Sequence, residues 1–240
     1  MTDDKHSTRG TGAQSDLSDP SGSPPPGDGG PDRTRQLVDQ LTGGFREQLD
    51  RALGIPLEDD PVALAYVDHY LSLLRREQRE PILRLIAAQA GAWFGELICR
   101  EIGARWVGDG TEPRRLRLLL EPAFVHFSPV DMAYEAIFSG PPGGDDPRLP
   151  EGAELDGAYH LRKRAPADAP AEGPAALSDH EWVLERLDEA PPMPEDQYYS
   201  LTGRFETLLL ILELLATRAA SQGREPTLYH LNDYLEELAG

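Results

Sequence analysis

Residues 81–138 read PILRLIAAQAGAWFGELICREIGARWVGDGTEPRRLRLLLEPAFVHFSPVDMAYEAIF. Their first part sets small residues beside large apolar ones at helical spacing, which predicts a helix from Pro81 to a stop at Gly103. Gly91 and Gly95 stand four residues apart in this helix, and such a pair lets another element approach its backbone closely. The helix is therefore expected to pack tightly inside a folded core.

The period of the apolar residues then changes from helical to extended. Alternation predicts short strands over residues 104–107, 116–120 and 123–127. Ser128 before Pro129 marks the start of a further helix. A long helix followed by short neighbouring strands predicts an α+β fold, a mostly helical single domain with a small antiparallel sheet of two to four strands.

Helices are also expected on both sides of this block. An apolar residue at every fourth position predicts one over residues 37–53. Asp60 before Pro61 marks the start of a second, because it combines a cap with a first-turn proline. Ser178 and Glu181 have the spacing of a capping box and start another.

The longest of these helices is expected from about residue 195 to 221. It is nearly apolar all round over residues 208–215, which is typical of a helix at the centre of a core. Glu213 interrupts the run, and it either faces solvent or an arginine or occupies a buried polar site. An amphipathic helix is expected after it, over residues 228–238.

Two segments have the composition of chain that does not fold. Residues 1–32 are rich in Ser, Gly, Pro and Asp, and they are predicted to be a disordered tail because they bury too little apolar surface. Residues 139–177 hold many prolines and are predicted to be a flexible insertion, with one strand-like island at 158–164. The remainder, residues 33–240, is predicted to form one globular domain.

Charge excludes some classes of partner. Acidic residues number 42 and basic residues 23, which gives a formal charge of −19. A negative field repels phosphate backbones and anionic lipid, so neither a nucleic acid nor a membrane is an expected partner. The apolar runs are shorter than the ~20 residues that span a bilayer, and the start of the chain does not read as a signal peptide. A cytoplasmic protein is expected, and the scarcity of lysine suggests a GC-rich bacterial genome.

The sequence offers no recognisable motif for a metal or a cofactor. The six histidines are not paired at helical ligand spacing, and His180–Glu181 lacks the second histidine of a zinc-protease motif because Leu184 stands there. Glycine-rich phosphate loops and a serine nucleophile elbow are also missing. No cofactor and no metal are therefore expected.

Glu96 and His126 are the two candidate catalytic residues. Glu96 stands on an otherwise apolar helix, where it is either a functional acid or the partner of Arg100 one turn away. His126 lies within an apolar strand. Cys99, the single cysteine, is interpreted as a small buried hydrophobe.

Four tyrosines form the candidate interaction surface. They are Tyr198, Tyr199, Tyr229 and Tyr234. Aromatic side chains anchor protein interfaces, and on an acidic protein they suit contact with a basic partner.

The segments Gly91-Ala-Trp-Phe-Gly-Glu96, Ile102-Gly-Ala-Arg-Trp-Val107 and Phe127-Ser-Pro129 resemble a pattern found in bacterial domains of unknown function. In those domains a helix with Gly-Glu near its end leads to a Trp-containing strand, a second strand, a proline and a helix. The resemblance covers about residues 81–138. It implies a small α+β domain and supplies no catalytic residues.

These observations favour a non-catalytic bacterial protein that binds another protein, as an adaptor, a regulator or an immunity-type protein. One alternative is an enzyme of unknown class whose carboxylates and histidine converge only in the fold. Another is a structural subunit of a larger assembly. The sequence leaves the partner and the oligomeric state open.

Overall fold

A computed structural model of the chain describes residues 29–163 and 177–239. The helices are α1 (Gly29–Leu53), α2 (Leu64–Leu73), α3 (Glu80–Glu101), α4 (Pro129–Phe138), α5 (Asp179–Asp188), α6 (Glu195–Tyr198), α7 (Leu201–Ser221) and α8 (Leu231–Ala239). The strands are β1 (Ala104–Val107), β2 (Arg117–Leu120), β3 (Val125–Phe127) and β4 (His160–Leu161). The fold is mostly helical α+β, as predicted.

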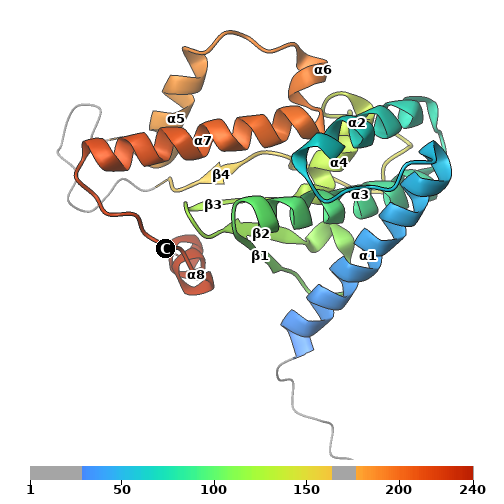
Figure 1. Ribbon diagram of the computed structural model, residues 1–240, viewed down its shortest axis with the longest axis horizontal. Helices are drawn as coiled ribbons and strands as arrows, with labels where there is room; N and C mark the ends of the chain where they lie inside the picture. The colour runs from blue at the N-terminus through green and yellow to red at the C-terminus, as the bar shows by residue number, and fades with distance from the viewer. Residues whose placement is uncertain (1–28, 164–176, 240) are drawn as a thin grey trace, which may run out of the picture.

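The strands form one antiparallel sheet in the order β1-β2-β3-β4 (Figure 1). Trp106 lies opposite Leu118, which lies opposite Phe127, so these three side chains share one face. That face joins the main core, while Leu119 and His126 point to the other face. The prediction of a small antiparallel sheet is confirmed, and β4 falls inside the predicted island.

Helix α3 is the centre of the core, between α1 and α4 (Figure 1). A Cβ added at Gly91 would lie 2.6 Å from the carbonyl oxygen of Pro129 at the start of α4. A Cβ at Gly95 would meet the indole of Trp106. The predicted close approach at both glycines is confirmed. By length and hydropathy α3 also qualifies as a membrane span, but most of it is buried in the core, as in the central helix of a soluble protein.

Helix α7 differs from its prediction, because it is not the central helix. Its first half packs on the core through Leu201, Phe205, Leu208 and Ile211, all buried. Its second half extends along the sheet past β4 towards α5, and Arg218 is the only side chain there that is fully buried (Figure 1). Apolar composition alone does not distinguish a helix buried on all sides from one that keeps an apolar face open.

The predicted boundaries of the flexible segments also differ where the structure describes them. Helix α1 begins at Gly29, so residues 29–32 are helical, while residues 1–28 lie outside the described residues. In the predicted insertion, Leu149 and Ala153 join the main core and Arg148 pairs with Asp146. Prolines there form turns that bring apolar side chains inward. Residues 164–176 again lie outside the described part of the chain.

Two buried carboxylates of α4 connect this helix to other parts of the chain. Asp131 accepts a hydrogen bond from the backbone N–H of Asp156 at 3.3 Å. Glu135 forms a buried ion pair with Arg204 of α7. Burial raises the pKa of Glu135, and the charge of Arg204 opposes that rise. The pair therefore links α4 to the buried half of α7.

Candidate functional site

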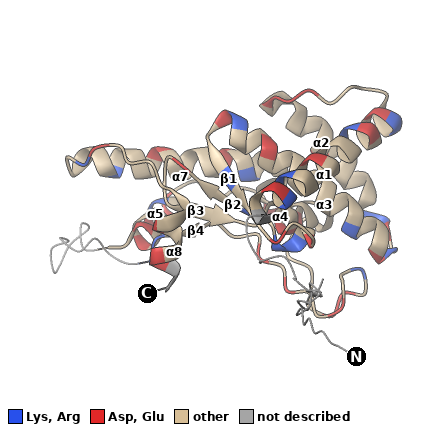
Figure 2. Cartoon of the chain, turned by 90° about the horizontal axis from the view of Figure 1, so that it is seen from below, with Lys and Arg blue, Asp and Glu red and all other residues tan. Residues whose placement is uncertain are grey.

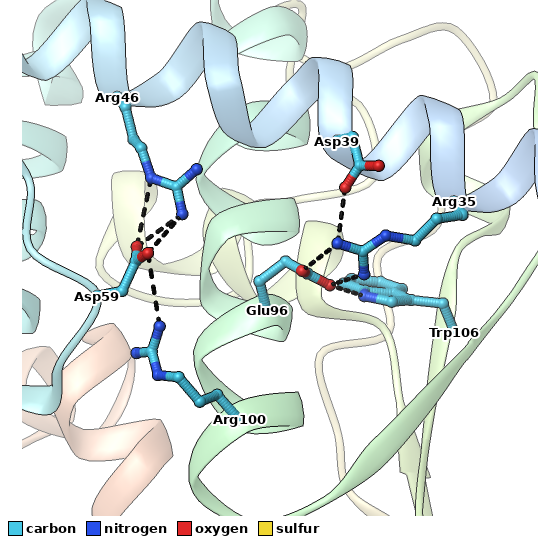
Figure 3. A network of polar contacts seen from close by, with 7 residues as sticks. All are labelled: Arg35, Asp39, Arg46, Asp59, Glu96, Arg100 and Trp106. Carbon is cyan, nitrogen blue, oxygen red and sulfur yellow. Dashed lines mark hydrogen bonds and ion pairs between the residues drawn. The ribbon is translucent and has the colours of Figure 1, made fainter.

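Glu96 lies at the junction of α1, α3 and β1 (Figure 3). Its two carboxylate oxygens accept hydrogen bonds from Arg35 at 2.9 and 2.8 Å, and one of them accepts a third from Trp106 Nε1 at 2.8 Å. The pairing with Arg100 is not formed, because Arg100 contacts Glu101 at 3.2 Å and Asp59 at 3.6 Å instead. Glu96 thus links α1, α3 and β1, and both of its carboxylate oxygens accept hydrogen bonds from side chains of the protein.

Cys99 lies one turn from this network and is half-buried. Burial, reinforced by the charge of Glu96, raises the pKa of its thiol to about 12. A thiol with that pKa stays protonated near neutral pH and is a poor nucleophile. The interpretation of Cys99 as a small hydrophobe agrees with this environment.

His126 lies on the opposite face of the sheet from Trp106, and hence from Glu96. Its ring stacks on that of His160, with centroids 4.9 Å apart and planes at 16°. Burial, followed by the charge of His160, lowers the pKa of His126 to about 4, so the ring is neutral at pH 7. The two candidate catalytic residues therefore do not meet. Within residues 29–163 and 177–239, no cluster of three or more His, Cys, Asp or Glu side chains is arranged to hold a metal ion.

The four tyrosines do not form one surface. Tyr234 is only 1% exposed, and its hydroxyl accepts a hydrogen bond from Val125 N at 3.0 Å, so its predicted surface role is wrong. Its ring stacks on Phe124 and holds α8 against the outer face of the sheet. Tyr198 and Tyr199 lie elsewhere, over the guanidinium of Arg204.

The remaining tyrosine, Tyr229, lines a groove that was not predicted from the sequence. One wall is the second half of α7, another is the turn formed by residues 122–124, and the third is the segment 224–229. We call this cavity, of about 420 Å³, the α7 groove. It lies between residues 122–124 and a distant stretch of the chain, the end of α7 with the segment that follows it.

The apolar wall of the groove is one face of α7. It consists of Leu212, Leu215, Ala216, Ala219 and Ala220, and this spacing places all five on a single helical stripe. Phe124 and Tyr229 contribute aromatic residues to the other walls. The lining is therefore mainly apolar, with three charged residues, Asp179, Arg224 and Glu225.

The walls are held in position by buried polar contacts. Arg218, 2% exposed, donates to the carbonyl oxygen of Ser178 and to Asp179 Oδ1, each at 2.9 Å, which ties α7 to the start of α5. Across the groove, Tyr229 N donates to the carbonyl oxygen of Glu121 at 2.8 Å. The groove is therefore formed before any partner binds.

The surroundings of the groove are acidic. Residues 177–240 contain 13 acidic residues and four arginines. Arg204 and Arg218 are both buried against carboxylates, whereas Glu206, Glu213 and Glu236 are exposed. Figure 2 shows Asp and Glu along α5, α7 and α8. A negative potential is therefore expected on this side of the molecule.

The sequence contains one signal for the groove, the surplus of apolar residues in α7, but composition alone predicts burial from it. Comparison with family models, with curated proteins and with solved structures finds no match. The resemblance to bacterial domains of unknown function therefore stays a prediction.

Proposed function

We propose that this chain is a non-catalytic protein-binding protein, of adaptor, regulatory or immunity type, that contacts its partner through the α7 groove. One observation carries the proposal: the apolar stripe of α7 continues beyond the core into a preformed cavity that no described residue fills. Apolar surface of this kind on a folded protein marks an interaction site.

The shape of the apolar surface favours a protein over a small molecule. A pocket for a small ligand encloses most of the ligand. Here the wall formed by residues 224–229 also carries Leu228, which stands between the lining residues Thr227 and Tyr229 and is 64% exposed. A partner that covers both the cavity and this segment buries that side chain as well.

The charge of the chain narrows the class of partner. The acidic surroundings favour a protein with a basic surface and disfavour nucleic acids and anionic membranes. A cytoplasmic, bacterial setting is part of the same proposal and rests on composition. The enzyme alternative loses its first two candidate residues as a pair, because Glu96 and His126 lie on opposite faces of the sheet.

The test is affinity purification of the tagged full chain from the organism that makes it. Leu228→Ser removes the exposed apolar side chain at the groove, and Leu73→Ser is the matched control on α2, where Leu73 is 60% exposed. We expect one protein to co-purify with the wild type and the control and to be depleted with Leu228→Ser.

Two results would contradict the proposal. The first is recovery of no specific partner under gentle conditions. The second is a partner that Leu228→Ser and Leu73→Ser retain equally, which places the contact elsewhere. A structural subunit is recognised by light scattering, because it purifies only as an obligate oligomer.

A further inference from the structure

The long wall of the α7 groove is helix α7, which presents side chains and no free backbone groups to the cavity. The backbone N–H and C=O groups of α7 between its ends are hydrogen-bonded within the helix. An extended peptide that adds to a sheet needs a strand edge with free backbone groups, and this wall offers none. A helical segment satisfies its own backbone and requires only apolar contacts, so the wall suits a helix.

The stripe on α7 also has the spacing that a second helix needs. Residues at i, i+3, i+4 and i+7 form ridges between which the side chains of another helix pack. The cavity of about 420 Å³ lies in the lower part of the range of about 300–1,000 Å³ found for ligand sites. It therefore accepts a few large side chains from one helix face, with the rest of the helix outside.

Charge separates the possible occupants. A second copy of this chain would bring a surface with the same excess of acidic residues, and like charges oppose that contact. Glu225 in the lining of the groove and Glu213 on α7 are both exposed, and the basic residue of the lining, Arg224, is exposed beside Glu225. Lysine or arginine beside the apolar face of an incoming helix has the opposite charge to these carboxylates and is attracted to them.

From these three observations we infer that the α7 groove binds an amphipathic helix of another protein, whose apolar face is flanked by lysine or arginine. The inference rests on the proposed function and names the chemistry of its partner. Steering by the acidic surface makes binding strongest at low salt.

The probes are three synthetic peptides of 18 residues. One is an amphipathic helix of leucine, alanine and lysine; the second replaces every lysine with glutamate; the third is the first in an order that destroys the apolar face. Binding to the full chain is followed by fluorescence anisotropy. We expect the basic helix to bind at least about tenfold more tightly than either other peptide, with an affinity that falls as salt is added.

Site-directed variants locate the binding. Ala216 is exposed and lines the groove, so Ala216→Arg obstructs it without filling the core. Ala65→Arg is the matched control, because Ala65 is an exposed alanine on α2. We expect Ala216→Arg to weaken binding of the basic helix at least about tenfold and Ala65→Arg to leave it unchanged. Circular dichroism and urea unfolding establish that both variants fold.

Several results would overturn the inference. They are failure of the basic helix to bind, equal binding of the acidic helix, and unchanged binding by Ala216→Arg. Self-association that Ala216→Arg abolishes would identify a second copy as the occupant instead. If the peptides fail to bind but a protein partner is lost in Leu228→Ser, the inference of a basic helical occupant is overturned, while the proposal of protein binding stands. Failure of both experiments overturns the proposed function as well.

Discussion

Gly91 allows a test of how closely α3 approaches α4. In Gly91→Ala the new Cβ would lie 2.6 Å from both Pro129 O and Val130 Cα. These are backbone atoms, so no side chain can rotate away, and the start of α4 must move. That movement also disturbs the cap, in which Ser128 Oγ accepts a hydrogen bond from Asp131 N at 3.2 Å.

The size of the effect follows from opposing contributions. Alanine in place of glycine within a helix is favourable by about 1 kcal/mol. Overpacking costs about 1–3 kcal/mol, and disturbance of a helix cap costs about 1 kcal/mol more. The net expectation for Gly91→Ala is a loss of about 1–3 kcal/mol in the free energy of unfolding.

The matched control is the same substitution in α1. A Cβ added at Gly43 meets nothing within 4 Å, so Gly43→Ala keeps the helical gain and is expected to stabilise the protein by about 0.5–1 kcal/mol. Urea unfolding followed by circular dichroism measures both variants. The reasoning is refuted if Gly91→Ala is as stable as the wild type, or if the two substitutions change stability in the same direction.

Three further predictions concern charged and titratable groups. Glu96→Gln keeps an acceptor for the indole but loses the ion pair with an exposed arginine, so unfolding in urea should show a loss of about 1 kcal/mol or less; a larger loss would contradict the exposed-pair description. Arg204→Met leaves Glu135 buried without its cation and should cost about 3–5 kcal/mol at pH 7. Burial raises the pKa of Glu135 and Arg204 opposes that rise, so the pKa should be higher still in Arg204→Met. The variant then loses more stability than the wild type as pH rises, and its deficit should shrink in acid; a deficit independent of pH would argue against a buried ionised Glu135. The ring protons of His126 should titrate near pH 4 by NMR, and titration at 6.5 would exclude the buried stack. Because the pKa of His126 is depressed in the folded state, the free energy of unfolding should decrease as pH falls from 6.5 to 4, and this decrease should be smaller in His126→Gln.

Local signals in the sequence predicted local structure well. The cap and proline at Ser128–Pro129 start α4, and the capping box of Ser178 and Glu181 starts α5, because these hydrogen bonds join residues three apart. The change from helical to extended spacing identified β1 over residues 104–107, because the period of the apolar residues is also a property of neighbouring positions. Each of these features depends only on its immediate neighbours in the chain.

Contacts between distant residues were not predictable in this way. The partner of Glu96 is Arg35, which is 61 positions away, and no spacing rule links the two. Tyr234 looked like a surface residue because its buried contacts are carbonyls more than 100 positions distant. The α7 groove presents the same difficulty, since the fold alone brings residues 122–124 beside α7 and the segment that follows it.

The buried ion pairs of this protein also shape the surface that surrounds the groove. The buried carboxylate of Glu135 needs a cation and obtains it from Arg204 of α7, while the partly buried Asp179 pairs with the buried Arg218. Two of the four arginines of residues 177–240 are thereby removed from the surface, while most of the 13 acidic residues stay exposed. The surface around the groove is therefore more acidic than the composition of this segment indicates. Exposed apolar side chains promote self-association, and this charge opposes it and favours the basic partner that we propose. The contacts that fix α7 in place thus also contribute to the charge around its open face.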